Sequence, residues 1–177
     1  MVWLLESLPF VSYNVAFKLV SVSGALLLPA GAYSFARGLR APWPAPPAFA
    51  IAATGMLVQT RDGWQIYGGN IASTLAGEFA FTIALAIGLF ALGALGRTLD
   101  TGKRPWLPAL LLALAAMSHV VVAIVMGLFA LLLFLTRRPW RTWPLAGAIG
   151  AVAVALTAVW SLPLIARVFT RQQWLIV

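Results

Sequence analysis

Polar side chains that could take part in chemistry are rare in this sequence, so each one is informative. Glu78 lies inside a long apolar run, with Thr74 four residues before it and Thr82 four residues after it. This spacing predicts a single polar stripe on one face of a helix. An ionised carboxylate within a bilayer is costly and usually faces a protein interior or a wet cavity. Thr74 and Glu78 are therefore candidates for substrate contact, and an interhelical hydrogen bond is the structural alternative.

The only histidine, His119, follows Ser118 near the middle of the apolar run 106–136. An imidazole can bind a phosphate, or act as an acid or a base near neutral pH. The alternative is a polar cap that satisfies backbone groups at a break between helices. Ser118 and His119 are both candidate substrate-binding residues.

A polar segment, 60–70, supplies three more candidates: Arg61, Asp62 and Asn70. Arg61 and Asp62 form either a solvated pair or a site in which the guanidinium binds a phosphate or polar substrate. The sequence Gly68-Gly69-Asn70 predicts a turn into a helix with Asn70 as the N-cap, and the bare amides of that helix start could hold an anion. No Gly-Lys-Ser/Thr follows, so the segment is not a phosphate-binding loop of the Walker type.

The composition indicates whether these residues belong to a soluble protein or to a membrane protein. Of 177 residues, 62% are hydrophobic and 9% are charged, whereas a soluble domain has about 25% charged residues. The mean hydropathy is +0.96. We therefore predict an all-α integral membrane protein, a polytopic helical bundle that forms a single transmembrane domain over residues 1–177.

The absence of cysteine excludes disulfides and thiolate catalysis. One histidine and four acidic residues make a protein-only metal site unexpected, so we predict no metal ligands. No residue pattern indicates a cofactor, and a divalent cation is left open.

The apolar runs predict about six spans, two of them short: 15–35, 46–60, 71–96, 106–118, 120–136 and 144–164. As one helix, the run 106–136 would be about 46 Å long, against a hydrocarbon core of about 30 Å. A hairpin of two short helices with Ser118 and His119 at its tip avoids this excess length. In the last span, Gly147, Ala151 and Ala155 recur every four residues, which favours close helix–helix packing.

The basic residues favour the hairpin as well. With a hairpin, one side of the membrane holds eight Lys and Arg residues and the other holds four. A single span would divide them seven to five. The larger group comprises Arg37, Arg40, Arg97, Lys103, Arg104, Arg137, Arg138 and Arg141.

This distribution predicts that loops 36–45, 97–105 and 137–143 are cytoplasmic in a multi-pass protein of the plasma membrane. The net charge of +8 thus indicates orientation and contact with the lipid bilayer. Nucleic acid is not an expected partner, because no basic patch interleaved with aromatic residues exists outside the spans.

Two strings, Tyr13-Asn-Val-Ala-Phe-Lys-Leu19 and Tyr67-Gly-Gly-Asn-Ile-Ala-Ser-Thr-Leu-Ala-Gly-Glu-Phe-Ala-Phe81, read like a family signature. Together with Ser118-His119 in a run of leucine and alanine, they resemble actinobacterial multipass membrane proteins with a 6-pyruvoyl-tetrahydropterin-synthase-related domain. The soluble pterin synthase needs a zinc-binding histidine cluster, which one histidine cannot form.

That membrane family in turn resembles the GT-C class of glycosyltransferases in the order of its elements. The resemblance implies transfer of a sugar from a polyprenyl-phosphate carrier to a hydroxyl acceptor in cell-envelope glycan assembly. It implies a polyprenyl-phosphate sugar donor as the ligand, with Glu78, Arg61 and His119 in contact with substrate. It assigns no catalytic residue, because GT-C enzymes carry their catalytic acid in a first outer loop that this sequence does not contain. We therefore expect either a fragment of a longer protein or a truncated relative, inactive on its own.

Two alternatives remain open at this point. A transporter or flippase-like protein would use Glu78 as a proton-coupling site, although no inverted repeat is visible. A non-catalytic membrane subunit would pack against a membrane-protein partner through the small residues of the last span.

Overall fold

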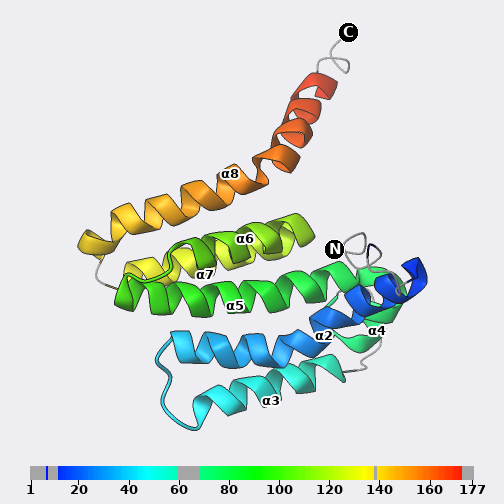
Figure 1. Cartoon of the computed structure of the whole chain (residues 1–177), viewed down its shortest axis with the longest axis horizontal. Helices are drawn as coiled ribbons and strands as arrows, with labels where there is room; N and C mark the ends of the chain where they lie inside the picture. The colour runs from blue at the N-terminus through cyan, green and yellow to red at the C-terminus, as the bar shows by residue number, and fades with distance from the viewer. Residues whose placement is uncertain (1–6, 8–11, 60–67, 138, 173–177) are drawn as a thin grey trace.

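Helices make up all the regular secondary structure in the part of the chain that the computed structural model describes, residues 7, 12–59, 68–137 and 139–172. Figure 1 shows the arrangement of the elements. The elements are α2 (Tyr13–Gly38), α3 (Ala45–Leu57), α4 (Ile71–Ser73), the π-helical turn η2 (Thr74–Glu78), α5 (Phe79–Thr101), α6 (Trp106–Ser118), α7 (Val120–Thr136) and α8 (Pro139–Gln172). The predicted fold class, an all-α integral membrane bundle, is confirmed.

The helices fall into two length classes. Three segments are long and apolar enough to cross a membrane: Tyr13–Gly38, Ile71–Thr101 and Trp143–Arg167. The apolar helices α3, α6 and α7 are shorter. A helix of 13 residues, such as α3 or α6, rises about 20 Å, which is less than the hydrocarbon core of about 30 Å. Among the described residues, the six predicted segments are therefore three long helices and three short ones, one more short helix than the sequence predicts.

The predicted hairpin is present. Helices α6 and α7 run side by side in opposite directions (Figure 1), and His119 joins them with an extended backbone (φ −158°, ψ 114°). At the far end of α7, Arg137 makes an ion pair with Asp100 at the end of α5. One continuous helix would have carried Arg137 to the opposite end of the bundle from Asp100.

Helix α5 lies at the centre and packs against α2, α6 and α7. Its contact with α2 is close because glycines recur every seven residues on α2, at Gly24, Gly31 and Gly38. A Cβ atom on Gly38 would lie 2.5 Å from the carbonyl oxygen of Gly93 on α5. The two backbones therefore touch, and α2 holds α5 in a fixed position.

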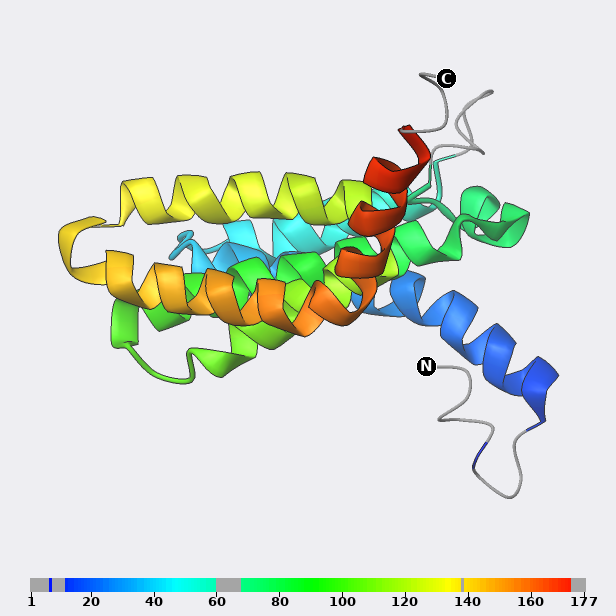
Figure 2. The same ribbon diagram turned by 90° about the horizontal axis from the view of Figure 1, so that it is seen from above.

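Helix α8 is attached more loosely. It packs on α6 and α7 through buried Ile149, and its C-terminal part turns away from the bundle, as Figures 1 and 2 show. Gly147, Ala151 and Ala155 are exposed, and no atom lies within 4 Å of a Cβ atom built on Gly147. The close packing predicted for these small residues is thus not made within the described chain.

Candidate functional site

The long helical segment that contains Glu78 is broken immediately before this residue. Gly77 has a φ of 113°, which L side chains rarely adopt, and the turn Thr74–Glu78 is π-helical. Glu78 consequently becomes the N-cap of α5 instead of lying two turns inside a continuous helix. The sequence does not predict this break, because a single glycine in an apolar run is also common inside regular helices.

The predicted polar stripe is wrong for the same reason. The hydroxyl oxygens of Thr74 and Thr82 lie 3.2 Å apart and both residues are buried, whereas Glu78 is exposed. The break rotates Glu78 off the face that the two threonines share. Within the described part of the chain, the Glu78 carboxylate makes no hydrogen bond and no ion pair.

Asn70 is the N-cap that the sequence predicts. Its side-chain oxygen accepts hydrogen bonds from the backbone N–H and the hydroxyl of Ser73, both at 2.7 Å. The Thr74 hydroxyl donates to the Asn70 carbonyl oxygen at 2.9 Å. All three residues are buried. The side chains of Asn70 and Thr74 therefore support the start of this helical segment.

His119 lies at the hairpin tip and touches α5. Its ring packs edge-to-face on Phe81, with centroids 5.3 Å apart, and its Nδ1 atom is buried without a hydrogen-bond partner. Gly68 also lies close to the Phe81 ring, because a Cβ atom on Gly68 would lie 2.5 Å from it. The structure thus brings the hairpin tip, the start of α5 and the Gly68-Gly69 turn together around one aromatic ring.

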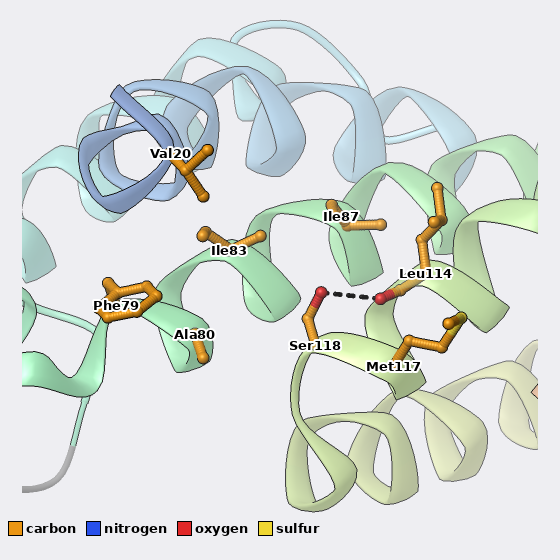
Figure 3. A pocket seen from close by; sticks show the side chains of 8 residues that line it. All are labelled: Val20, Phe79, Ala80, Ile83, Ile87, Leu114, Met117 and Ser118. Carbon is orange, nitrogen blue, oxygen red and sulfur yellow. Dashed lines mark hydrogen bonds between the residues drawn. The ribbon is translucent and has the colours of Figure 1, made fainter. Parts of the chain in front are cut away.

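Ser118 lies beside His119 but borders a different space. Its hydroxyl donates to the Leu114 carbonyl oxygen at 2.8 Å. Ser118 is one wall residue of a groove of about 350 Å³ between α2, α5 and α6, which Figure 3 shows. The other lining residues are Val20, Phe79, Ala80, Ile83, Ile87, Leu114 and Met117. The sequence does not reveal the groove, because its apolar lining has the same pattern as an ordinary packed core.

The remaining candidates, Arg61 and Asp62, lie outside the described residues. Among the described residues, no group of three or more His, Cys, Asp or Glu side chains is placed to hold a metal ion.

At the C-terminal end of α5, charged side chains form ion pairs. Asp100 pairs with Arg40 (Nε–Oδ2 2.7 Å) and with Arg137, and Arg137 also donates to the Gly38 carbonyl oxygen at 3.1 Å. Arg97 donates to the backbone and hydroxyl oxygens of Ser34 at 3.3 Å. This end gathers Arg37, Arg40, Arg97, Lys103, Arg104 and Arg137 at the termini of α2, α5 and α7. Arg141 lies in the first turn of α8, and Arg138 lies outside the described residues.

Comparison with known proteins identifies the family. The family model described as "6-pyruvoyl-tetrahydropterin synthase related domain; membrane protein" matches residues 4–175, so the chain belongs to this family of membrane proteins. Searches of curated proteins and of solved structures found no match. His119 is the only histidine, so the chain does not contain a histidine cluster of the kind that binds zinc in the soluble synthase.

Proposed function

We propose that this member of the 6-pyruvoyl-tetrahydropterin synthase related family is part of a GT-C-like glycosyltransferase of the plasma membrane. The donor would be a sugar linked to a polyprenyl phosphate, and the product a cell-envelope glycan. In the reaction, an acceptor hydroxyl oxygen bonds to the anomeric carbon while the bond from that carbon to the phosphate breaks. The lipid phosphate leaves, and the hydroxyl proton passes to a general base. The residue that acts as the base is left unassigned.

One observation carries the proposal: two unpartnered polar groups lie near the N-terminal end of α5. The Glu78 carboxylate is exposed and unpaired in the described chain, and the buried Nδ1 atom of His119 has no partner. The two residues are linked through Phe81, which contacts the His119 ring and follows Glu78 by three positions. Buried polar groups without partners are uncommon in folded proteins, and a ligand is one way to satisfy them.

The assigned roles follow from the chemistry of these two residues. The imidazole of His119 can donate a hydrogen bond to a phosphate oxygen, and the carboxylate of Glu78 can accept hydrogen bonds from sugar hydroxyl groups. Arg61 and Asp62 remain predicted substrate contacts in the segment that precedes Asn70. We place this end at the outer membrane surface, because the cations at the other end favour a cytoplasmic location for residues 36–45, 97–105 and 137–143.

A binding experiment tests this function. The detergent-solubilised protein is titrated with a polyprenyl-phosphate-linked hexose and, separately, with the free polyprenol, and tryptophan fluorescence is recorded. We expect saturable binding of the phosphate-linked sugar, and affinities about tenfold lower for Glu78→Gln and for His119→Ala. Equal binding of the free polyprenol, or unchanged affinity in both variants, would contradict the proposal.

A second candidate function, proton-coupled transport, is favoured by the break at Gly77. Transporters use discontinuous membrane helices with an ionisable residue at the break, and Glu78 occupies that position. This alternative predicts proton uptake by proteoliposomes on addition of substrate, and loss of that uptake in Glu78→Gln. The glycosyltransferase proposal predicts no proton flux.

A role as a non-catalytic subunit rests on the exposed small residues of α8. A membrane-protein partner would cover Gly147, Ala151 and Ala155, which are uncovered within the chain. Gly147→Leu would then reduce co-purification of that partner without changing the stability of the isolated chain.

A further inference from the structure

The groove between α2, α5 and α6 has the form of a lipid-chain site. Its walls are Val20 on α2, Ala80 and Ile83 on α5, and Leu114 and Met117 on α6, and they enclose about 350 Å³ (Figure 3). A volume of this order lies at the lower end of the range of small-molecule pockets, about 300–1,000 Å³. The three walls can surround a slender ligand on three sides.

The interior of the groove offers little to a polar ligand. Ser118 is the only lining residue with a polar side chain, and its hydroxyl already donates to the Leu114 carbonyl oxygen. A polar group placed here would lose its hydrogen bonds to water and gain few in return. A hydrocarbon chain has no such cost.

The position of the groove points to a chain that comes from the bilayer. Two of its walls, α2 and α5, belong to segments long and apolar enough to cross a membrane, and the family is one of membrane proteins. One end of the groove adjoins the candidate site, because Phe79 follows Glu78 directly and Ser118 precedes His119. A lipid whose chain fills the groove would therefore carry its headgroup to the site.

We propose that this groove binds one hydrocarbon chain of a lipid substrate and holds its headgroup at Glu78 and His119. The proposal rests on the proposed function, in which the chain is the polyprenyl tail of the donor. It assigns a binding role to Ala80, Ile83, Leu114 and Met117, none of which is marked by a sequence motif.

Photo-crosslinking tests the groove directly. The probe is an isoprenoid phosphate with a diazirine in its chain, added to the protein in nanodiscs of unlabelled phospholipid. After irradiation, mass spectrometry locates the adducts. We expect them to be concentrated at residues 79–87 and 114–118. Adducts spread over the exposed apolar faces of α7 and α8 would show ordinary bilayer contact and would overturn the proposal.

A matched pair of substitutions tests whether the lipid chain occupies the groove. Ala80→Phe fills the groove, whereas Ala52→Phe adds the same ring to an exposed position on α3. We expect labelling of residues 114–118 to fall about tenfold in Ala80→Phe, because a chain loses about fourfold in affinity for each buried CH₂ that is displaced. Ala52→Phe should leave the labelling unchanged. Equal labelling of the two variants would contradict the proposal.

A widening substitution keeps the test decisive if Ala80→Phe fails to fold. Leu114→Ala removes bulk from one wall, so it should raise labelling by the branched isoprenoid probe relative to a straight-chain probe of equal length. An unchanged ratio would count against the groove as the chain site.

A change of headgroup separates this proposal from the proposed function. A diazirine lipid with a neutral headgroup should label the groove less than the phosphate probe does. Equal labelling of the groove by both probes would mean that a chain binds there and that phosphate recognition, and with it the glycosyltransferase proposal, fails.

Discussion

The two ends of α5 differ in whether their polar groups have partners. At the C-terminal end, Asp100 pairs with two arginines, and Arg137 donates in addition to a backbone carbonyl group. At the N-terminal end, the helix begins after a break, the Glu78 carboxylate has no partner in the described chain, and the buried Nδ1 atom of His119 is unsatisfied. The 23 residues between these ends span about 35 Å, close to the thickness of a bilayer. The ion pairs at the C-terminal end stabilise the fold, whereas the proposed function assigns the unpartnered groups at the N-terminal end to ligand binding.

The largest expected loss of stability comes from the close contact between α2 and α5 near the C-terminal end of α5. Gly38→Leu would force a side chain into the backbone of α5 at Gly93, and overpacking of this kind costs about 3 kcal/mol. Thermal unfolding followed by tryptophan fluorescence in detergent should show a large fall in Tm. The control is Gly127→Leu on α7, where no atom lies within 4 Å of an added Cβ atom. A similar Tm for both variants would show that α2 and α5 are not in close contact.

Removal of the Asp100 carboxylate at the C-terminal end of α5 should cause the next largest loss of stability. Asp100 and Arg137 have side chains that are 16% and 18% exposed, whereas the Arg40 side chain is 67% exposed. Asp100→Ala should cost about 2 kcal/mol of unfolding free energy, because it leaves the partly buried Arg137 unpaired. Arg40→Ala should cost less than about 1 kcal/mol, because its pair with Asp100 is largely solvated. A double-mutant cycle measures both couplings, and a stronger coupling to Arg40 than to Arg137 would reverse this assignment.

The smallest effect separates backbone strain from charge at the same position. Arg40 has a φ of 58°, a left-handed conformation that costs an L residue about 1 kcal/mol and costs glycine almost nothing. Arg40→Gly and Arg40→Ala both remove the ion pair, but only the glycine variant relieves the strain. Arg40→Gly should therefore be about 1 kcal/mol more stable than Arg40→Ala in chemical denaturation. Equal stabilities would mean that the left-handed backbone at Arg40 carries no strain.

Much of this architecture follows from elementary properties of the sequence. The hairpin is predictable, because one helix over residues 106–136 would be too long for the bilayer. It would also divide the basic residues more evenly between the two sides of the membrane. Asn70 is predictable as an N-cap, because it stands between two glycines and an apolar helix. These features depend on local chemistry and on the thickness of the membrane.

The site itself is less predictable, because it depends on one backbone angle and on contacts between distant segments. The left-handed Gly77 turns Glu78 away from Thr74 and Thr82, and a four-residue spacing cannot reveal this rotation. The contact of His119 with Phe81, and the groove beside Ser118, arise only when α6 packs on α5. A single sequence carries no signal for either of them.

The most direct test of the central claim measures stability and binding on the same set of variants. Glu78→Gln and His119→Ala at one end of α5 are compared with Asp100→Asn at the other, by thermal unfolding and by titration with a polyprenyl-phosphate-linked hexose. We predict that Glu78→Gln keeps its Tm, that His119→Ala loses only the contact of its ring with Phe81, and that both lose about tenfold in affinity. Asp100→Asn should lose more stability and bind the hexose donor normally when folded. If Glu78→Gln and His119→Ala lower the Tm as much as Asp100→Asn does and leave the affinity unchanged, the two ends of α5 do not differ in this way.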